Sequence, residues 1–292
     1  MKIENETLAF QWYFPFSIFH FQLAKPSVSA IVLSYRSPKD TLGCVRALLT
    51  QTIVDRLEII VVDNHSDTDS IGILRTQLPR DPRVHIVETA KNLGYGKGNN
   101  FGARFAKGEY LLIINPDNIM PPDALEKMVH VLKSDPGIGI LAPKLVFPSG
   151  LKRDSARAFP SFADVFIKRT FLRYIFPGRI AAYVAIAGRE DSSSAMMDVD
   201  WVAGACLLLR RSFFEELQGF DPQFFLFFED TDLCRRVHQA GKRVVYDPAI
   251  VVADRERRLS EGGVLSVLTK RTVRSHLVSA IKYFLKWRGQ NG

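Results

Sequence analysis

Cysteine is scarce in this chain, which has three among its 292 residues. They lie far apart and form no CxxC pair: Cys44, Cys206 and Cys234. This excludes a disulfide framework and a cysteine zinc site, and it favours a reducing compartment. The composition, 47% hydrophobic and 24% charged, excludes intrinsic disorder. A chain of this length buries a core without disulfide or metal support, as one large domain or two small ones.

Uncharged runs are few, and the longest suits an interfacial or packed segment better than the alternative, a membrane span. The longest, residues 7–24, is long enough to cross a bilayer, but it contains Gln11, Pro15 and His20 and seven aromatic residues. It also lacks the cationic start and cleavage site of a signal peptide. We interpret residues 1–26 as an aromatic N-terminal extension. We expect a cytoplasmic protein, with peripheral contact at the cytosolic face of the membrane as an option.

Excess positive charge is confined to the C-terminal end. Of the net charge of +8, +7 falls within residues 255–292, and the nearly neutral remainder argues against nucleic acid as a partner. Residues 261–292 are predicted to contain a basic amphipathic helix after the linker Gly262–Gly263. Its predicted apolar and cationic faces comprise, respectively, Leu277, Ile281, Phe284 and Leu285, and Lys282, Lys286 and Arg288. Two interpretations stay open: the helix binds an anionic membrane surface, or it packs on the protein with its cations in water.

Strands and helices alternate through residues 27–260. Apolar runs predict buried parallel strands over 28–34, 57–62, 84–87 and 110–114, with helices over 37–51, 70–78 and 96–106 between them. Such units indicate an α/β domain with a mostly parallel central sheet and helices on both faces. Later strands are predicted over 139–147, 199–210 and 244–246, a helix over 231–240, and loops over the site within 151–198.

Three of the predicted strands end in polar residues. They are followed by Ser34-Tyr35, Asp63-Asn64 and Asn115-Pro116-Asp117. Each pair or triplet alone is an ordinary turn sequence. Ligands bind outside the carboxyl ends of parallel strands, however, and together these ends offer an aromatic face for a base, an acceptor for an imide or ribose hydroxyl, and a carboxylate for a hard cation.

Two further segments carry candidate chemistry. The glycine-rich run from Asn92 to Gly102 leads into a helix, where backbone approaches a ligand closely and the helix start favours anions; a flexible loop is the alternative. Glu229, Asp230 and Asp232 follow the apolar run FFLFF. An apolar approach raises a carboxyl pKa toward that of a useful base, whereas a helix start favours the anion, and Asp230 and Asp232 are also good capping residues.

Six segments of the chain, and the order in which they occur, match those of a known protein family. They are VSAIVLSYRS, LEIIVVDNHS, NLGYGKGNNFGARFAKGEYLLIINPD, SARAFPS, VDWVAGACLLLRR and GFDPQFFLFFEDTDLCRR, spread over roughly residues 27–260. The chain resembles the family 2 glycosyltransferases of the GT-A fold, and most closely their bacterial rhamnosyltransferase-like branch.

The resemblance implies a role for each matched residue. On the nucleotide-sugar side it implies that Tyr35 and Asp63 hold a pyrimidine base, that Asn115 and Asp117 stand at the DxD-type motif, and that Asp117 reaches a divalent cation, Mg²⁺ or Mn²⁺. The loop of Asn92 and Gly94 is assigned to the same side. On the acceptor side it implies that Asp230 is the general base, and it assigns to the acceptor Glu229, Trp201, Gly204 and a loop containing Ser155 and Arg157.

One position departs from the family pattern. The family has a metal-binding His six residues after the proline of the strand VVYDPAIVV, and this chain has Asp254 there. An aspartate is a harder ligand and suits Mg²⁺ at least as well. Alternatively, Asp254 pairs with Arg255 or Arg257 and the metal is held without it.

The resemblance thus implies an inverting transfer of a hexose, with rhamnose favoured by the branch. The donor is a nucleoside-diphosphate sugar, and the acceptor is a hydroxyl of a glycan or lipid-linked acceptor in cell-surface polysaccharide synthesis. Two alternatives are a sugar-1-phosphate nucleotidyltransferase, whose glycine-rich signature is missing near the first strand, and a non-catalytic nucleotide-sugar-binding homologue.

Overall fold

The computed structural model describes residues 26–161, 163, 167, 175, 178, 195–255 and 271–289. The predicted aromatic segment of residues 7–24, the Gly262–Gly263 linker and Arg257 lie outside these ranges. Within them, no helix combines the length and apolar character needed to cross a membrane.

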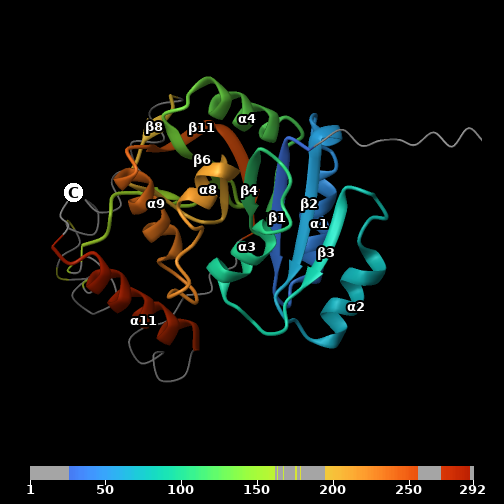
Figure 1. The fold of residues 1–292 in the computed structure, drawn as a ribbon, viewed down its shortest axis with the longest axis horizontal. Helices are drawn as coiled ribbons and strands as arrows, with labels where there is room; N and C mark the ends of the chain where they lie inside the picture. Colours follow the sequence, from blue (N-terminus) through green and yellow to red (C-terminus); the bar gives the residue numbers. More distant parts are fainter. Residues whose placement is uncertain are drawn as a thin grey trace, which may run out of the picture.

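The first half of the chain forms the predicted parallel sheet (Figure 1). Its strands β1 (Val28–Ser34), β2 (Leu57–Asp63), β3 (Val84–Glu88) and β4 (Tyr110–Ile114) lie in the order β3-β2-β1-β4. All three pairings among them are parallel. The connecting helices are α1 (Pro38–Leu48), α2 (Thr68–Gln77) and α3 (Tyr95–Ala103), and a short 3₁₀ turn η1 (Val54–Arg56) precedes β2.

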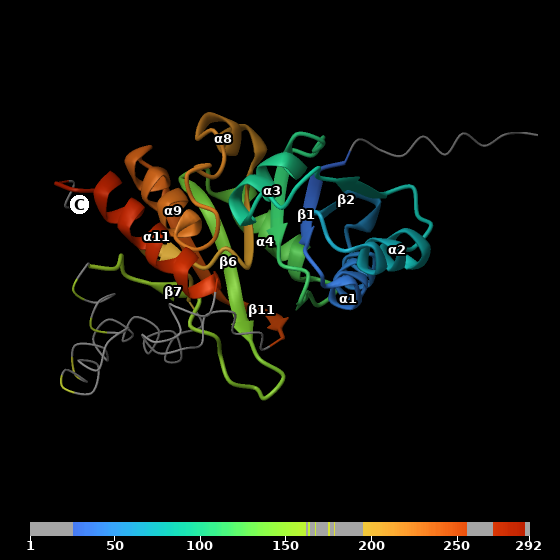
Figure 2. The same cartoon turned by 90° about the horizontal axis from the view of Figure 1, so that it is seen from below.

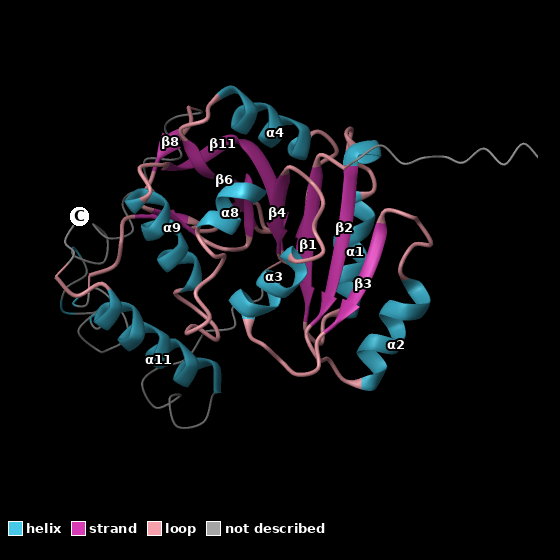
Figure 3. Ribbon diagram, viewed as in Figure 1, coloured by secondary structure: helices cyan, strands magenta, loops and turns pink. Residues whose placement is uncertain are grey.

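The strands after β4 extend the sheet with mixed directions (Figure 3). Strand β10 (Cys206–Arg210) runs antiparallel to both β4 and β6 (Ile138–Val146). Strand β11 (Arg243–Asp254) pairs parallel to β6, and the short strands β5 (Asn118–Ile119) and β8 (Met197–Asp198) run antiparallel to β11. The predicted strand over 199–210 is divided, because β9 (Trp201–Val202) pairs with β7 (Ala156–Arg157) in a separate two-stranded sheet.

Helices cover both faces of the central sheet, as predicted (Figure 2). Alternate residues of β1 face opposite sides: Val32 belongs to the core under α1, α2 and α4 (Ala124–Ser134), whereas Ile31 belongs to the core under α3, α8 (Arg211–Glu216) and α9 (Glu229–Gln239). Both side chains are fully buried, which is why these strands read as continuous apolar runs.

The C-terminal helix α11 (Arg271–Lys286) packs beside α9 on the body of the protein (Figures 1 and 2). Its buried side chains form a third core with the segment before α9, made of Phe224, Phe228, Ala280, Tyr283 and Trp287. Packing on the protein is therefore confirmed. Leu277, Ile281 and Leu285 are exposed together, whereas Phe284, which is predicted to share their face, packs against this third core. Of the predicted cationic residues, Lys286 is paired with two aspartates.

Candidate functional site

The register of the sheet brings the predicted strand ends to one edge. Ser34 lies opposite Asp63, Val32 lies opposite Ile114, and Ile114 lies opposite Cys206. The Asn115 N–H donates to the Ala205 carbonyl at 2.8 Å, which ties the end of β4 to the start of β10. The polar residues after β1, β2 and β4 therefore line the same edge, as the sequence predicts.

Asp63 presents a buried acceptor atom at this edge. The residue is 3% exposed, and its Oδ2 accepts a hydrogen bond from the Ser66 N–H at 3.0 Å. Its Oδ1 is buried without a hydrogen-bond partner among the described residues. Tyr35, directly after β1, is 42% exposed. An unused acceptor beside an open aromatic ring suits a planar base that carries an N–H donor.

Asn64 organises the glycine-rich loop, a role that sequence analysis missed. Its amide donates to the Gly94 carbonyl at 3.1 Å and to Asn92 Oδ1 at 3.2 Å, and its Oδ1 accepts from the Leu93 N–H at 2.9 Å. Asn92 Oδ1 also accepts from the Gly94 N–H at 2.9 Å. The described hydrogen bonds of the Asn92 side chain, which is predicted to bind the nucleotide sugar, are therefore with Asn64 and with its own loop.

Gly94 allows this loop to touch the segment before α9. It has φ +80°, and a Cβ there would lie 2.1 Å from the Phe225 carbonyl oxygen. The Tyr95 N–H donates to that same oxygen at 2.8 Å. Only glycine combines this left-handed backbone with so close an approach.

Asp230 is held by backbone and hydroxyl donors. Its Oδ2 accepts from the Gly204 N–H at 3.0 Å, and its Oδ1 accepts from the Thr231 N–H at 2.7 Å and hydroxyl at 3.3 Å. Burial raises the pKa of Asp230, and these hydrogen bonds oppose the shift. A Cβ at Gly204 would lie 3.3 Å from the Asp230 Cβ, so the glycine permits this approach.

Glu229 lies beside Asp230 in a more apolar setting. It is 5% exposed, and its Oε2 is buried without a hydrogen-bond partner among the described residues. Burial, and secondly the charge of Asp230, raise its pKa well above the ordinary value. Phe227 and Phe228, just before it, have φ of +70° and +69°, a left-handed conformation that bulky residues rarely adopt. The backbone that positions Glu229 and Asp230 is therefore strained.

Tyr95 connects α3 to the acidic pair and was also missed. Its hydroxyl donates to the Gly204 carbonyl, whose own N–H binds Asp230. Burial raises the Tyr95 pKa well above its ordinary value, and the charges of Glu229 and Asp230 add to the shift. The neutral phenol therefore acts as a fixed donor that helps to place Gly204.

Asp117 and Asp254 form a second acidic pair beyond β4. Asp254 ends β11 opposite Asn118, and the Arg255 N–H donates to the Asp117 carbonyl at 3.2 Å. Burial, followed by the negative charge of Asp254, raises the pKa of Asp117 to about 6. Asp254 is 1% exposed, and its pKa is also raised by burial.

Two arginines neutralise this region. Arg153 forms an ion pair with Asp254 Oδ2, and Arg255 pairs with Asp40 Oδ1 at 2.6 Å. The proposed pairing of Asp254 with Arg255 is therefore wrong, and the actual partner is an arginine 101 residues away in sequence. Asp254 Oδ1 is buried with no hydrogen-bond partner among the described residues, so this carboxylate keeps one atom for a further ligand.

Two of the predicted acceptor residues, Arg157 and Trp201, meet in the small two-stranded sheet. Arg157 lies opposite Trp201, and its guanidinium carbon is 5.6 Å from the centre of the Trp201 ring. The Trp201 indole N–H donates to the Ala158 carbonyl at 2.8 Å, and the Ser155 carbonyl accepts from the Ala203 N–H at 2.7 Å. This sheet therefore joins directly to Gly204 and so to Asp230.

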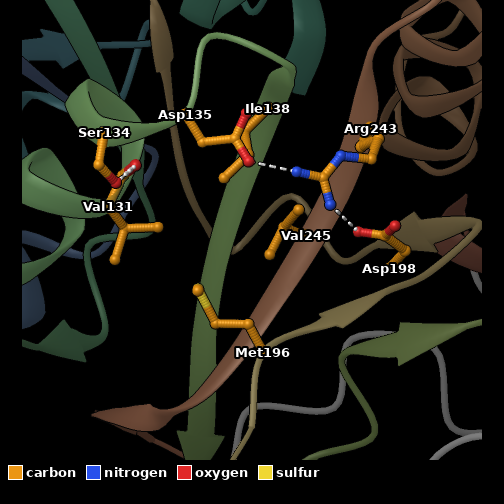
Figure 4. A pocket seen from close by; sticks show the side chains of 8 residues that line it. All are labelled: Val131, Ser134, Asp135, Ile138, Met196, Asp198, Arg243 and Val245. Carbon is orange, nitrogen blue, oxygen red and sulfur yellow. Dashed lines mark hydrogen bonds and ion pairs between the residues drawn. The ribbon is translucent and has the colours of Figure 1, made fainter.

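A separate cavity lies at the opposite edge of the central sheet (Figure 4). It has a volume of about 400 Å³ and is lined by the starts of β6 and β11 together with α4 and β8. Arg243 pairs there with Asp135 and, at 2.8 Å, with Asp198. None of the predicted site residues lines it.

Comparison with known proteins identifies the family. Residues 29–218 match the model of glycosyl transferase family 2. The chain belongs to glycosyl transferase family 2. It is 28% identical over 236 residues, 77% of the chain and 75% of the relative, to the N-acetylglucosaminyl-diphospho-decaprenol L-rhamnosyltransferase of Mycobacterium tuberculosis. It is 31% identical over 164 residues, 53% of the chain and 58% of the relative, to the rhamnosyltransferase WbbL of Escherichia coli K12.

The fold comparison agrees with this membership. A crystal structure of GalNAc-T7 with UDP, GalNAc and Mn²⁺ superposes with a TM-score of 0.61 at 15% identity, over 91% of this chain and 48% of that one. This chain therefore spans about half the length of that protein. The GT-A fold and the rhamnosyltransferase-like resemblance are confirmed, and the nucleotidyltransferase alternative loses its support.

The residues of this family member fit a hard divalent cation. Asp117 and Asp254 supply carboxylate oxygens, the ligands that Mg²⁺ and Mn²⁺ prefer, and Asp254 Oδ1 is a buried acceptor with no partner in the described chain. No group of three His, Cys, Asp or Glu side chains in the described ranges is arranged to hold a metal. Two carboxylates are a sufficient protein contribution when substrate phosphates and water complete the coordination.

Proposed function

We propose that residues 27–260 transfer a hexose, with rhamnose as the first candidate, from a nucleoside-diphosphate sugar to a hydroxyl of a glycan or lipid-linked acceptor. The observation that carries the proposal is the hydrogen-bonded path from the Asn115 N–H to the Ala205 carbonyl and from the neighbouring Gly204 N–H to Asp230 Oδ2. This path supports a shared site for the donor-side acids and the candidate base. The relatives that transfer rhamnose support the choice of sugar.

In the proposed reaction, Asp230 accepts the proton of the acceptor hydroxyl. The hydroxyl oxygen forms a bond to the anomeric carbon as the bond to the diphosphate breaks, and configuration inverts. A buried carboxylate with a raised pKa is a stronger base than one in water, and the donors from Gly204 and Thr231 hold both of its oxygens in place. Proximity to the rigid strand β10 keeps the base oriented.

On the donor side, Asp63 Oδ1 accepts from the base and Tyr35 stacks on it. Asp117 and Asp254 would hold a divalent cation, which when bound supplies Lewis-acid stabilisation of the departing diphosphate. Arg153 and Arg255 add positive charge within the same region.

A donor screen tests the proposal most broadly. Purified protein is incubated with dTDP-, UDP- and GDP-sugars in Mg²⁺ or Mn²⁺, and release of nucleoside diphosphate is measured with and without a polyprenyl-diphosphate-linked sugar acceptor. We expect dTDP-rhamnose to give the highest acceptor-dependent release. Tight donor binding without release from any sugar would identify a non-catalytic homologue instead.

A further inference from the structure

The outer face of α11 is unusually apolar for a surface helix. Four of the ten exposed large hydrophobic side chains in the described chain lie on it. We call these the aliphatic stripe: Leu277, Val278, Ile281 and Leu285, which are 47–65% exposed. Their spacing of one, three and four residues places them on one side of the helix. A cluster of this kind marks an interaction surface.

The opposite face of α11 is already satisfied by contacts with the protein. Tyr283 is fully buried, and its hydroxyl accepts a hydrogen bond from Arg235 at 2.5 Å. The Trp287 indole donates to Asp232 Oδ1 at 3.0 Å, and Lys286 pairs with the same atom at 2.6 Å. The helix is thus anchored by one face, and the aliphatic stripe is left without a role in holding it.

Exposed cations border the aliphatic stripe. Arg274 and Lys282 are exposed on the same helix and Arg288 is exposed in the turn that follows it, and the C-terminal 38 residues hold +7 of the net charge of +8. An aliphatic strip bordered by arginine and lysine is the surface of a helix that lies in a membrane interface, with its apolar side chains among acyl chains and its cations at anionic headgroups.

The place of this helix relative to the acidic pair also fits a membrane. The Ser279 hydroxyl donates to the Leu226 carbonyl at 2.9 Å, and His276 contacts the rings of Phe227 and Phe228, which directly precede Glu229. A bilayer that holds α11 therefore lies close to the side where the acceptor is proposed to enter. This last point rests on the proposed function.

We propose that the aliphatic stripe and its bordering cations dock the protein on an anionic bilayer, so that a lipid-linked acceptor reaches Asp230 from the membrane. The partner is the lipid surface itself. A second copy of the chain would require a partner for the cations, and the described part of α11 carries no acidic residue to pair with them.

Vesicle sedimentation tests this proposal with the full chain. We expect wild-type protein to pellet with phosphatidylcholine vesicles containing about a third phosphatidylglycerol, and to stay in solution with phosphatidylcholine alone. The double variant Ile281→Glu/Leu285→Glu should bind at least ten times more weakly, and each of Arg274→Gln and Arg288→Gln about five times more weakly. Phe105→Glu, at an exposed aromatic residue outside α11, is the matched control and should bind as the wild type does.

Three results would overturn the proposal. These are wild-type protein that stays in solution with anionic vesicles, a double variant that pellets normally, or a wild-type dimer in gel filtration that the double variant abolishes.

Circular dichroism verifies that the variants fold. Transfer to a water-soluble acceptor should be unchanged in the double variant, and loss of all transfer in a vesicle-binding wild type would reject the proposed function while leaving the membrane surface intact.

Discussion

Asp230 and Asp117 are both partly buried carboxyls, but their surroundings prepare them for different tasks. The described hydrogen bonds of the Asp230 carboxylate come from Gly204 and Thr231, and they hold it in one orientation. The pKa of Asp117 is raised first by burial and then by the charge of a second carboxylate, Asp254. A carboxylate held by hydrogen-bond donors suits proton transfer, whereas two carboxylates that repel each other suit a cation.

Asp230→Asn tests the first of these tasks. General-base catalysis contributes about 10²- to 10⁴-fold, so kcat should fall by that factor while donor affinity stays the same. Turnover and donor binding are measured separately, by product formation and calorimetry. Glu215→Gln makes the same carboxylate-to-amide change at an exposed residue of α8 and should leave both unchanged. Near-native kcat in Asp230→Asn would reject the assignment.

If Asp117 and Asp254 bind a cation, the affinity for that cation should depend on pH, because Asp117 titrates in the metal-free protein. Asp117 should titrate near pH 6, because the raised pKa keeps it protonated below that pH and charged above it. Mn²⁺ affinity should therefore fall as the pH drops through 6. Asp254→Asn removes the like charge and should lower the pKa of Asp117, whereas Arg153→Gln removes a nearby cation and should raise it. Carboxyl NMR measures all three, and equal pKa values would contradict this electrostatic account.

At the scale of elements, two contacts position the start of α9. Gly94 lets the glycine-rich loop touch Phe225, and α11 holds Asp232 through Trp287 and Lys286. Asp232 is fully buried and also pairs with Arg236 at 2.8 Å, so it is a structural residue rather than a ligand group. Both contacts join segments far apart in sequence.

Gly94→Ala should cost more stability than left-handed strain alone explains. Gly94 and Gly150 both have φ +80°, but a Cβ at Gly150 meets nothing within 4 Å. Gly150→Ala should therefore lose about 1–2 kcal/mol in urea unfolding, and Gly94→Ala clearly more, because its Cβ overlaps the Phe225 carbonyl. Equal losses would show that the loop moves aside freely.

Trp287→Phe tests the second contact. The change keeps the aromatic packing and removes the indole donor, which leaves Asp232 Oδ1 with one partner fewer in a buried setting. We expect unfolding free energy to fall by about 1–3 kcal/mol. Leu285→Ala, on the exposed face of the same helix, should change it little. A Trp287→Phe protein as stable as wild type would show that Lys286 and Arg236 satisfy the carboxylate alone.

For the whole molecule, local pattern predicts the parallel half of the sheet and the edge on which the site lies. The apolar runs predict buried strands such as β1 and β4 directly. The polar residues after these strands meet because parallel strands end at the same edge of the sheet. Strand β11 was predicted only over 244–246, since its second half alternates between buried and exposed residues and contains Pro248.

The features that sequence analysis missed depend on distant partners. Arg153 pairs with Asp254, which lies 101 residues away in sequence, and the Tyr95 hydroxyl donates to the Gly204 carbonyl, 109 residues away. The pattern groups Phe284 with Leu277 and Leu285, but Phe284 packs against the third core while the other two are exposed, because α11 has apolar side chains on two sides.

A crystal structure with dTDP and Mn²⁺ tests the central claim most directly. The account predicts the base against Tyr35 with its N–H on Asp63, the diphosphate and Mn²⁺ at Asp117 and Asp254, and Asp230 facing the open end of the diphosphate. Nucleotide bound at the opposite edge of the sheet, in the cavity beside Arg243, would contradict it.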